Sequence, residues 1–259
     1  MPDRTKVIDF LLPHPLKIFV RGIVSRIIGY QVVTSWKVAT QKSHGYSHPI
    51  TTGSIARSKN QSTEVSPFID ERYLRVSAAI LSSAMNIHRP LRVLDIGGAY
   101  GDHYFAIRQI APALEIDWLV LETEAHCRII PLELSRHLSL RWTSSDCVFN
   151  EKFDLVLMSS VIQYFENWNQ LIQKVAQCAP TLVFSRTPLS TSDTDRIAIQ
   201  RVGIRGSKGS YPVHILSKSN LVRTLSSIGK FQYWWESTDD IAVVRFEQIN
   251  SFGCVFRPN

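Results

Sequence analysis

The sequence predicts an α/β fold in which a mainly parallel sheet is closed at one edge by antiparallel strands. After Pro90, short apolar runs alternate with helical patterns, which is typical of parallel strands joined by crossover helices. These runs cover residues 91–96, 116–121, 138–142, 153–158 and 181–185. Beyond a helix predicted near residues 218–228, short turns join three more runs, and short connections indicate antiparallel strands. The three runs cover residues 231–236, 241–247 and 251–257.

The composition is that of a folded domain. The chain has 259 residues, of which 44% are apolar and 20% charged, and this excludes an intrinsically disordered protein. No run of about 18 apolar residues occurs, so the sequence predicts no membrane-spanning helix. Four single cysteines without a C-x-x-C pair argue against a zinc knuckle or a disulfide framework, and no export signal is evident. We therefore expect a cytoplasmic protein with reduced thiols.

The excess positive charge is concentrated in the N-terminal part. Residues 1–90 contain 12 Lys or Arg against 5 Asp or Glu, whereas the two kinds balance in residues 91–259. Residues 11–29 repeat apolar positions at helical spacing, and the other side of this pattern is basic, which predicts a basic amphipathic helix. The helix either lies on an anionic membrane surface as a peripheral contact or packs on the domain, and packing is the commoner case.

A long polar segment follows this helix. Residues 40–66 are rich in Ser, Thr, Gly, His and Lys without periodicity, which predicts a mobile loop that acts as a lid and carries Tyr46 toward a substrate. Ser66-Pro67 has the features of a helix start, so we expect a helix over residues 67–87. The chain is accordingly divided into an N-terminal extension, residues 1–66, and a main domain, residues 67–259.

The most informative motif is a glycine turn at the end of the first predicted parallel strand. Residues 93–101 read VLDIGGAYG, and a helical pattern starts directly afterwards. Gly97, Gly98 and Gly101 permit a tight turn and the close approach of a ligand, while the following helix offers unpaired N–H groups. The turn therefore predicts a nucleotide-like ligand. Taken alone, it is also compatible with NAD.

Carboxylates near the turn narrow the choice of ligand. Asp95 lies two residues before the first glycine, where it would repel a pyrophosphate but attract a cation. S-adenosylmethionine is such a ligand, because it carries an ammonium and a sulfonium group. Glu122 ends the second strand, where a carboxylate can accept hydrogen bonds from both ribose hydroxyls. Asp146 follows the third strand, where its side chain can bind the adenine amino group.

This combination resembles the class I S-adenosylmethionine-dependent methyltransferases. The matching elements are the glycine turn, the acidic strand end at Glu122, the loop at 145–147 and the segment FDLVLMSSVIQYFENW at 153–168. The resemblance implies a Rossmann-like, seven-stranded, mostly parallel sheet and S-adenosylmethionine as the cofactor. It also implies cofactor contacts at four strand ends: Gly97 and Gly101 at the methionine part, Glu122 at the ribose, Asp146 and Cys147 at the adenine, and Ser159 and Ser160 near the methyl group.

A narrower likeness covers nearly the whole chain. The segments LLPHPL, GYS, GDHYF, SRTPLS, SYPVHILS and FGCVFR look like those of a small bacterial group of methyltransferase-like proteins associated with surface-polysaccharide biosynthesis. This likeness implies an activated or lipid-linked sugar as the methyl acceptor. The chain departs from the group at Ala99-Tyr100, where Gly and Leu are more frequent, and the tyrosine there would crowd the cofactor or stack over the substrate.

Methyl transfer depends on orienting the acceptor, so a catalytic base is optional. If the acceptor is a hydroxyl or a carbon acid, a nearby His or Tyr can remove its proton. The candidates are His103, Tyr104, Tyr164, Tyr211 and His214. Each also has a structural interpretation: His103 and Tyr104 pack a crossover helix, Tyr164 belongs to the core, and Tyr211 and His214 lie in a surface loop.

Arg186 is expected to bind the acceptor. It follows the fifth predicted strand, at the edge where open α/β sheets bind ligands. Residues 186–208 contain five basic residues against two acidic ones, which favours a phosphate-bearing acceptor over a neutral one. A solvated basic loop is the alternative.

Two other classes of site are disfavoured. His44 and His48 have four-residue spacing but no helix and no acidic or cysteine partner, so no metal site is predicted. Ser159-Ser160-Val161 stands where many base-amino methyltransferases carry an Asn/Asp-Pro-Pro-aromatic signature, which argues against a nucleic-acid substrate. The sequence thus predicts methyl transfer to a small molecule. Its rivals are a non-catalytic cofactor-binding or scaffold protein and, less favoured, an NAD-dependent oxidoreductase.

Overall fold

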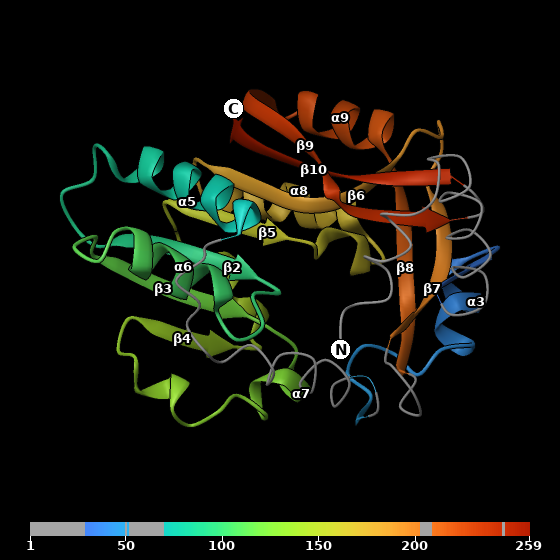
Figure 1. Ribbon diagram of the computed structural model, residues 1–259, viewed down its shortest axis with the longest axis horizontal. Helices are drawn as coiled ribbons and strands as arrows, with labels where there is room; N and C mark the ends of the chain where they lie inside the picture. The colour runs from blue at the N-terminus through green and yellow to red at the C-terminus, as the bar shows by residue number, and fades with distance from the viewer. Residues whose placement is uncertain (1–28, 50, 52–69, 203–208, 245–246) are drawn as a thin grey trace, which may run out of the picture.

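The computed structural model describes residues 29–49, 51, 70–202, 209–244 and 247–259 (Figure 1). Nearly all of the predicted amphipathic helix, and most of the predicted loop over residues 40–66, lie outside these ranges. Within them, no helix is long and apolar enough to cross a membrane.

In the described residues, seven strands of a ten-stranded sheet form its central part, in the order β4-β3-β2-β5-β6-β10-β9. The two strands at the β9 edge are antiparallel to their neighbours, and the other five are parallel, so the predicted architecture is confirmed. One detail of the prediction is wrong, because the run at 231–236 and residues 241–244 of the next run belong to one long strand, and Glu247 begins the following one. The strands are β2 (Leu91–Ile96), β3 (Ile116–Leu121), β4 (Leu140–Thr143), β5 (Leu155–Ser159), β6 (Leu182–Ser190), β9 (Gly229–Val244) and β10 (Glu247–Pro258).

A three-stranded unit that the sequence analysis does not predict continues from the end of β6. Its first strand pairs in parallel with Leu189 and Ser190, and the others follow antiparallel. In Figure 1 this unit stands across the end of the central sheet, beside the helix α3 (Trp36–Gln41). Its innermost to outermost strands are β8 (Gly209–Ser217), β7 (Arg196–Val202) and β1 (Tyr30–Val33). Because β1 comes from the N-terminal extension, the division of the chain at residue 66 separates strands of one sheet.

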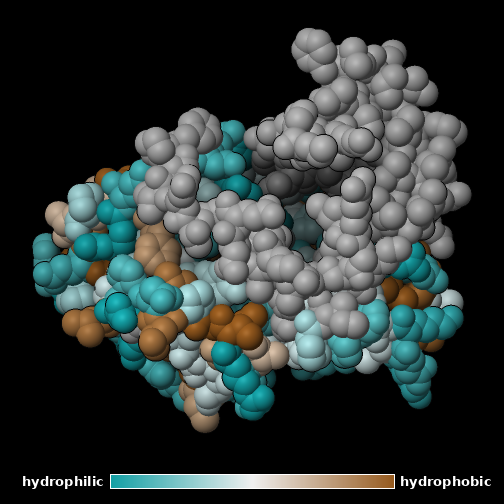
Figure 2. All heavy atoms as spheres, turned by 60° about the horizontal axis from the view of Figure 1, so that its bottom comes forward, coloured by the Kyte–Doolittle hydropathy of each residue, from teal (hydrophilic) through white to brown (hydrophobic). Residues whose placement is uncertain are grey.

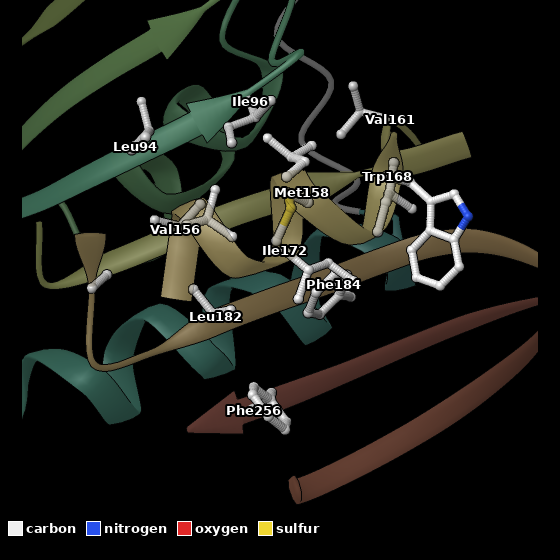
Figure 3. Packing of buried hydrophobic residues seen from close by; sticks show 14 of the residues in the cluster. Leu94, Ile96, Val156, Met158, Val161, Trp168, Ile172, Leu182, Phe184 and Phe256 are labelled. Carbon is white, nitrogen blue, oxygen red and sulfur yellow. The ribbon is translucent and has the colours of Figure 1, made fainter. Parts of the chain in front are cut away.

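Helices cover both faces of the central sheet, because alternate side chains of each strand point to opposite faces. On one face, Met158 of β5 and Phe184 of β6 pack with Ile172 of α8 (Figure 3). On the other face, Val93 and Leu157 pack with two further helices. The helices are α8 (Trp168–Cys178) and α9 (Lys218–Ser226) on the first face, and α5 (Glu71–Ala84) and α6 (Asp102–Ile110) on the second. Both cores hold the strand ends at fixed positions.

A capping residue determines where α5 begins. The Asp70 side chain accepts a hydrogen bond of 3.0 Å from the Arg72 N–H, so the helix starts at Glu71 rather than at residue 67. It ends at Ala84, three residues before the predicted end. Three short helices follow the carboxyl ends of strands: α7 (Glu124–Cys127) after β3, η2 (Asp146–Asn150) after β4, and η3 (Ile162–Tyr164) after β5. A fourth, η1 (Leu134–Arg136), precedes β4.

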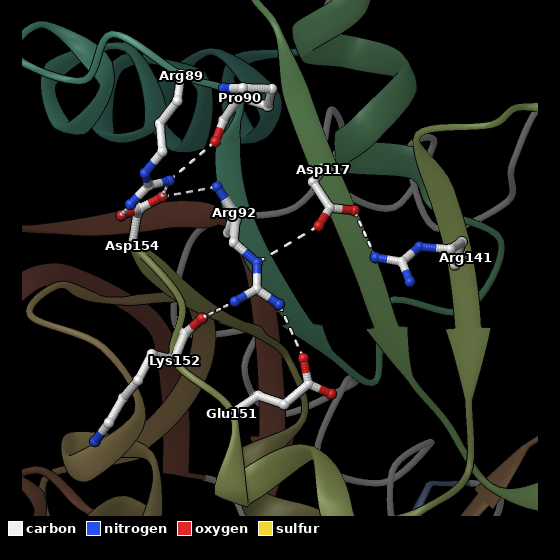
Figure 4. A network of polar contacts seen from close by, with 8 residues as sticks. All are labelled: Arg89, Pro90, Arg92, Asp117, Arg141, Glu151, Lys152 and Asp154. Atoms are coloured by element: carbon white, nitrogen blue, oxygen red, sulfur yellow. Dashed lines mark hydrogen bonds and ion pairs between the residues drawn. The ribbon is translucent and has the colours of Figure 1, made fainter.

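Ion pairs join the amino ends of the central strands (Figure 4). Arg89 makes two hydrogen bonds of 2.7 Å to Asp154, and the Arg92 N–H donates to the same carboxylate at 2.8 Å. Burial works against ionisation of Asp154, but these hydrogen bonds outweigh it and hold its pKa below the ordinary value. Asp117 extends the network to Arg92 and Arg141. This end of the sheet is therefore occupied by structural contacts.

Large apolar side chains also reach the surface beyond α7. Ile129, Leu132 and Leu138 are exposed in this segment. Figure 2, which brings the lower side of Figure 1 forward, shows hydrophobic patches separated by hydrophilic surface over its coloured part. Scattered exposure of this kind is ordinary for a folded protein.

Candidate functional site

Three strained residues mark the carboxyl ends of neighbouring strands. Ala99 has φ 49°, Ser160 φ 54° and Arg186 φ 52°, all in the left-handed region that side chains disfavour. They follow β2, follow β5 and interrupt β6, which are adjacent in the sheet. Each such residue costs about 1–3 kcal/mol and persists where the surroundings enforce it, commonly at functional sites. The candidate site therefore lies at this edge, as the sequence predicts.

The glycine turn forms a cradle over a buried carboxylate. Gly97 has φ 69°, and Gly101 has φ 82° and caps the N-terminus of α6. A Cβ atom on Gly98 would overlap the carboxylate of Asp95, which is fully buried. The indole N–H of Trp118 donates to this carboxylate at 3.3 Å. The backbone of the turn thus lies directly against a negative group, which suits a cationic ligand better than a pyrophosphate.

Glu122 connects the neighbouring strand end to the same turn. Its carboxylate accepts hydrogen bonds from the N–H groups of Ala99, at 3.1 Å, and Thr123, at 3.0 Å. The Ala99 carbonyl accepts from the indole of Trp142 at 2.7 Å. Glu122 is 6% exposed. These two hydrogen bonds fix the orientation of the carboxylate at the end of β3.

Asp146 and Cys147 lie at the end of β4, where the sequence analysis puts them. Both are exposed at the start of η2. The Cys147 N–H donates to the Ser145 hydroxyl at 3.2 Å, so an adenine contact through this N–H would have to replace or share that bond. Asp95, Glu122 and Asp146 thus lie at the carboxyl ends of three consecutive strands, an arrangement that fits a ligand combining cationic groups, a ribose and an adenine.

Tyrosines line the other side of the site. The ring of Tyr46 stacks between His126, at 4.8 Å, and Tyr164, at 5.9 Å, and meets the ring of Tyr211 edge-on at 5.3 Å. The segment that carries Tyr46 is tied to β8, because the Gly45 N–H donates to the Ser210 carbonyl at 2.9 Å. The structure therefore brings together three tyrosines that the sequence analysis names as site residues.

The tyrosine hydroxyls form a directed chain. Tyr211 donates to Tyr164, and Tyr164 donates to the side-chain oxygen of Gln200 at 3.2 Å. Burial raises the pKa of all three tyrosines, and for Tyr46 the negative charge of Glu122 raises it further. These hydroxyls stay protonated near neutral pH and act as hydrogen-bond groups rather than as bases.

A small cavity lies behind these rings. It is lined by Tyr30, Gln163, Gln200 and His214, among others, and its volume is about 20 Å³. A space of this size holds a single water molecule.

The remaining catalytic candidates lie in packed environments. Tyr104 is buried in the core and shares a hydrogen bond of 2.8 Å with Ser139. His103 is buried and meets the ring of Tyr73 edge-on at 5.1 Å. His214 stacks on Trp36 at 4.6 Å, shares a contact of 3.0 Å with the Glu166 carbonyl, and has its pKa lowered by burial. The structure does not bring these three residues into the tyrosine group.

Ser159 and Ser160, which the resemblance places near the methyl group, lie at the strained end of β5. Ser159 is the last residue of the strand, and the Ser160 N–H donates to the Ser185 carbonyl of β6 at 2.8 Å. The Gln163 amide donates to the Ser160 hydroxyl at 3.3 Å. These contacts fix the strand end beside the tyrosine group.

The basic residues that follow Arg186 bind other side chains of the protein. Arg196 pairs with Glu247 and with the Ser190 hydroxyl, and Arg201 donates to the Gln31 side chain at 2.9 Å. Within the described part of this segment, these residues do not form the phosphate-binding cluster that its composition suggests.

Comparisons with solved structures address the fold. The N-terminal domain of EvdMO1 with S-adenosylhomocysteine (SAH) bound aligns with a TM-score of 0.51 and 18% identity, covering 79% of this chain and 95% of that one. The same domain in the presence of SAH and D-fucose gives the same values. This chain shares that Rossmann-like fold. A methyltransferase from Burkholderia thailandensis, the 1,6-didemethyltoxoflavin-N1-methyltransferase, aligns at TM-score 0.48 and 15% identity over 81% of this chain and 88% of that one. No protein-family model and no curated protein sequence matches the chain.

Several residues of the site are missed by the sequence analysis: Tyr30, His126, Gln163 and Gln200. Gln200 lies opposite Tyr211 because β7 and β8 pair there. The β-branched residues Ile197, Ile199 and Val202 are the signal in the sequence that favours such a strand. His126 has no comparable signal, since only the short helix α7 places it under Tyr46.

Proposed function

We propose that this protein transfers a methyl group from S-adenosylmethionine to a small-molecule acceptor. One observation supports the proposal: the carboxylates of Asp95 and Glu122 are buried against the glycine turn. An ammonium or sulfonium group is stabilised there, whereas the pyrophosphate of NAD would be repelled. This favours a methyl donor over the oxidoreductase alternative.

The residues of this chain would contribute orientation. S-adenosylmethionine supplies an electrophilic methyl group on its sulfonium. Glu122 would hold the ribose, and Ser159 and Ser160 would border the reacting carbon at the end of β5. Tyr46 and Tyr164 would exclude water and position the acceptor, which is the main requirement of a direct displacement.

The finer part of the proposal is that the acceptor is a sugar, activated or lipid-linked. Aromatic rings combined with fixed hydroxyl groups suit a polyhydroxyl molecule, and Tyr46, Tyr164 and Tyr211 provide both. The similar EvdMO1 domain was crystallised in the presence of D-fucose, which is consistent with this assignment at the level of a shared fold.

Titration with SAH tests the cofactor assignment. We expect Glu122→Gln to raise the dissociation constant at least about tenfold, since about 1.4 kcal/mol corresponds to a factor of ten. The matched control is Glu124→Gln, because Glu124 lies two residues after Glu122 but is exposed and forms an ion pair with Arg128. Unchanged SAH affinity in folded Glu122→Gln, or tighter binding of NADH than of SAH by the unmodified chain, would contradict the proposal.

A second measurement separates an enzyme from a cofactor-binding scaffold. The full chain is incubated with S-adenosylmethionine and a panel of free, nucleotide-linked and lipid-linked sugars, and products are followed by mass spectrometry. A methylated sugar together with SAH supports catalysis. SAH binding without turnover of any acceptor would favour the scaffold alternative.

A further inference from the structure

The glycine turn contains one strained residue that is not a glycine. Gly97 and Gly101 have positive φ angles, which glycine adopts at little cost, but between them Ala99 has φ 49°. A residue with a Cβ atom is disfavoured in this left-handed region, so an alanine stays there only where its surroundings enforce the conformation. The contacts of Ala99 therefore identify what holds the turn in shape.

Both backbone polar groups of Ala99 are bound by side chains. Its N–H donates to the Glu122 carboxylate at 3.1 Å, and its carbonyl accepts from the Trp142 indole N–H at 2.7 Å. The second distance is at the short end of the range for N–H···O hydrogen bonds. The two bonds lie on either side of the Ala99 Cα atom, so together they oppose rotation about both φ and ψ.

The two side chains that bind Ala99 come from neighbouring strands. Trp142 lies on β4, and Glu122 directly follows β3; the two strands are parallel, with Trp142 opposite Val120. The Glu122 N–H donates to the Thr143 carbonyl at 2.9 Å, which continues the pairing to the strand ends. The backbone hydrogen bonds of the sheet therefore fix the distance between the two residues that bind the turn.

Packing alone does not account for a tryptophan at position 142. The side chain is only partly buried and covers one of the two hydrophobic cores. A phenylalanine could cover the same core, but it has no N–H group. The feature that distinguishes tryptophan here is the donor that reaches the Ala99 carbonyl.

We propose that Trp142 is a positioning residue, whose indole N–H keeps Ala99 in the left-handed conformation and so keeps the cofactor turn formed before the cofactor binds. The inference rests on the proposed function and deepens it, because it names a residue outside the predicted cofactor contacts that prepares the site for S-adenosylmethionine. If Ala99 relaxed to a negative φ, its N–H would leave Glu122. The Gly98 backbone would then move away from the Asp95 carboxylate. A turn that is already formed spares the ligand the free energy of ordering it.

The first test measures the turn without a ligand. Hydrogen exchange of the Ala99 amide, followed by NMR, reports how often this N–H leaves Glu122. We expect Trp142→Phe to accelerate the exchange about tenfold in the folded protein, because one of the two bonds that hold the residue is lost. Unchanged exchange would overturn the proposal.

The matched control is Trp168→Phe. It also removes one indole hydrogen bond, of 3.2 Å to Asp195, but not one to the turn. Because both variants lose a bond of the same kind, the control separates local opening of the turn from a general loss of stability. We expect it to leave the exchange of the Ala99 amide unchanged relative to that of the core amides. Equal acceleration at Ala99 in the two variants would overturn the proposal.

The second test is a double-mutant cycle on SAH affinity, measured by calorimetric titration of the full chain. We expect Trp142→Phe alone to raise the dissociation constant about tenfold. In the Ala99→Gly background, glycine adopts φ 49° without strain, so the same change should raise it less than about threefold. Equal losses in the two backgrounds would mean that Trp142 acts only by packing, which would overturn the proposal.

The unmodified chain decides the question if Trp142→Phe does not fold. The Trp142 indole N–H must then exchange with solvent much more slowly than that of Trp234, which is 58% exposed. Equally fast exchange of the two indoles would overturn the proposal. Failure of SAH to bind the unmodified chain is a separate result: it contradicts the proposed function, whereas the exchange of the Ala99 amide still tests whether Trp142 holds the turn.

Discussion

At the amino end of the central strands, the Arg89 guanidinium and the backbone N–H of Arg92 donate hydrogen bonds to the carboxylate of Asp154. The Arg89 side chain is exposed to solvent. At the carboxyl end of the same strands, Asp95 and Glu122 are buried against a turn whose backbone is bent into the left-handed region. Both ends use carboxylates. They differ in the source of the positive charge that balances these carboxylates. Arginine supplies it at the amino end, and the proposed cationic ligand would supply it at the carboxyl end. Substitutions at the two ends should therefore affect different measurements.

The largest effect is expected at the glycine turn. Gly98→Ala would place a Cβ atom against the Asp95 carboxylate, so the turn must move away from its position. We expect SAH affinity to fall about 100-fold, or about 2.7 kcal/mol, as measured by calorimetric titration. The neighbouring Ala99→Gly is the control: it relieves strain at φ 49° and keeps the N–H that binds Glu122, so affinity should stay within about threefold. Equal affinities of the two folded variants would mean that the close approach of Gly98 to the Asp95 carboxylate does not determine SAH binding.

The carboxyl end was also the more difficult end to predict. Strands such as β2 and β3 have the predicted bounds, because buried apolar runs that alternate with helical patterns leave few alternatives. Asp95 and Glu122 can be predicted as site residues because they lie at the ends of those strands. By contrast, Tyr30 and Gln200 enter the site through β1 and β7, which were not predicted.

A physical cause explains why the sequence does not predict β7. Residues 196–202 contain three β-branched residues, but the arginines among them suggest a basic loop, and pairing with β8 makes the segment a strand. Tertiary pairing decides such segments more than local preference does. The strain at Ser160 and Arg186 also leaves no mark in the sequence, since neither residue is a glycine.

An intermediate effect is expected in the tyrosine group. Tyr164→Phe removes the oxygen that accepts from Tyr211 and donates to Gln200, which leaves two polar groups without that partner. We expect a loss of about 1–3 kcal/mol in the free energy of unfolding, measured by urea denaturation. SAH affinity should change little.

The matched control for this variant is Tyr233→Phe. Tyr233 is 43% exposed on the edge strand β9, so removing its hydroxyl should change the unfolding free energy by less than about 0.5 kcal/mol. If both phenylalanine variants behave alike, the hydroxyl chain does not contribute to stability, and the tyrosines serve only as apolar packing.

The smallest effect is expected at the amino end, and it should depend on pH. The pKa of Asp154 is lowered in the folded protein, so its contribution to stability is present above the unfolded-state pKa of about 3.9. That contribution is lost as pH falls through the folded-state pKa. Because the ion pair is partly exposed and screened, Asp154→Asn should cost about 1 kcal/mol or less at neutral pH. Urea denaturation of both proteins at pH 7 and at successively lower pH should show the difference shrinking below about pH 4, with SAH affinity at neutral pH unchanged in the variant. A difference that stays constant with pH would mean that Asp154 acts through packing, and a fall in SAH affinity would mean that the two ends of the sheet are not independent.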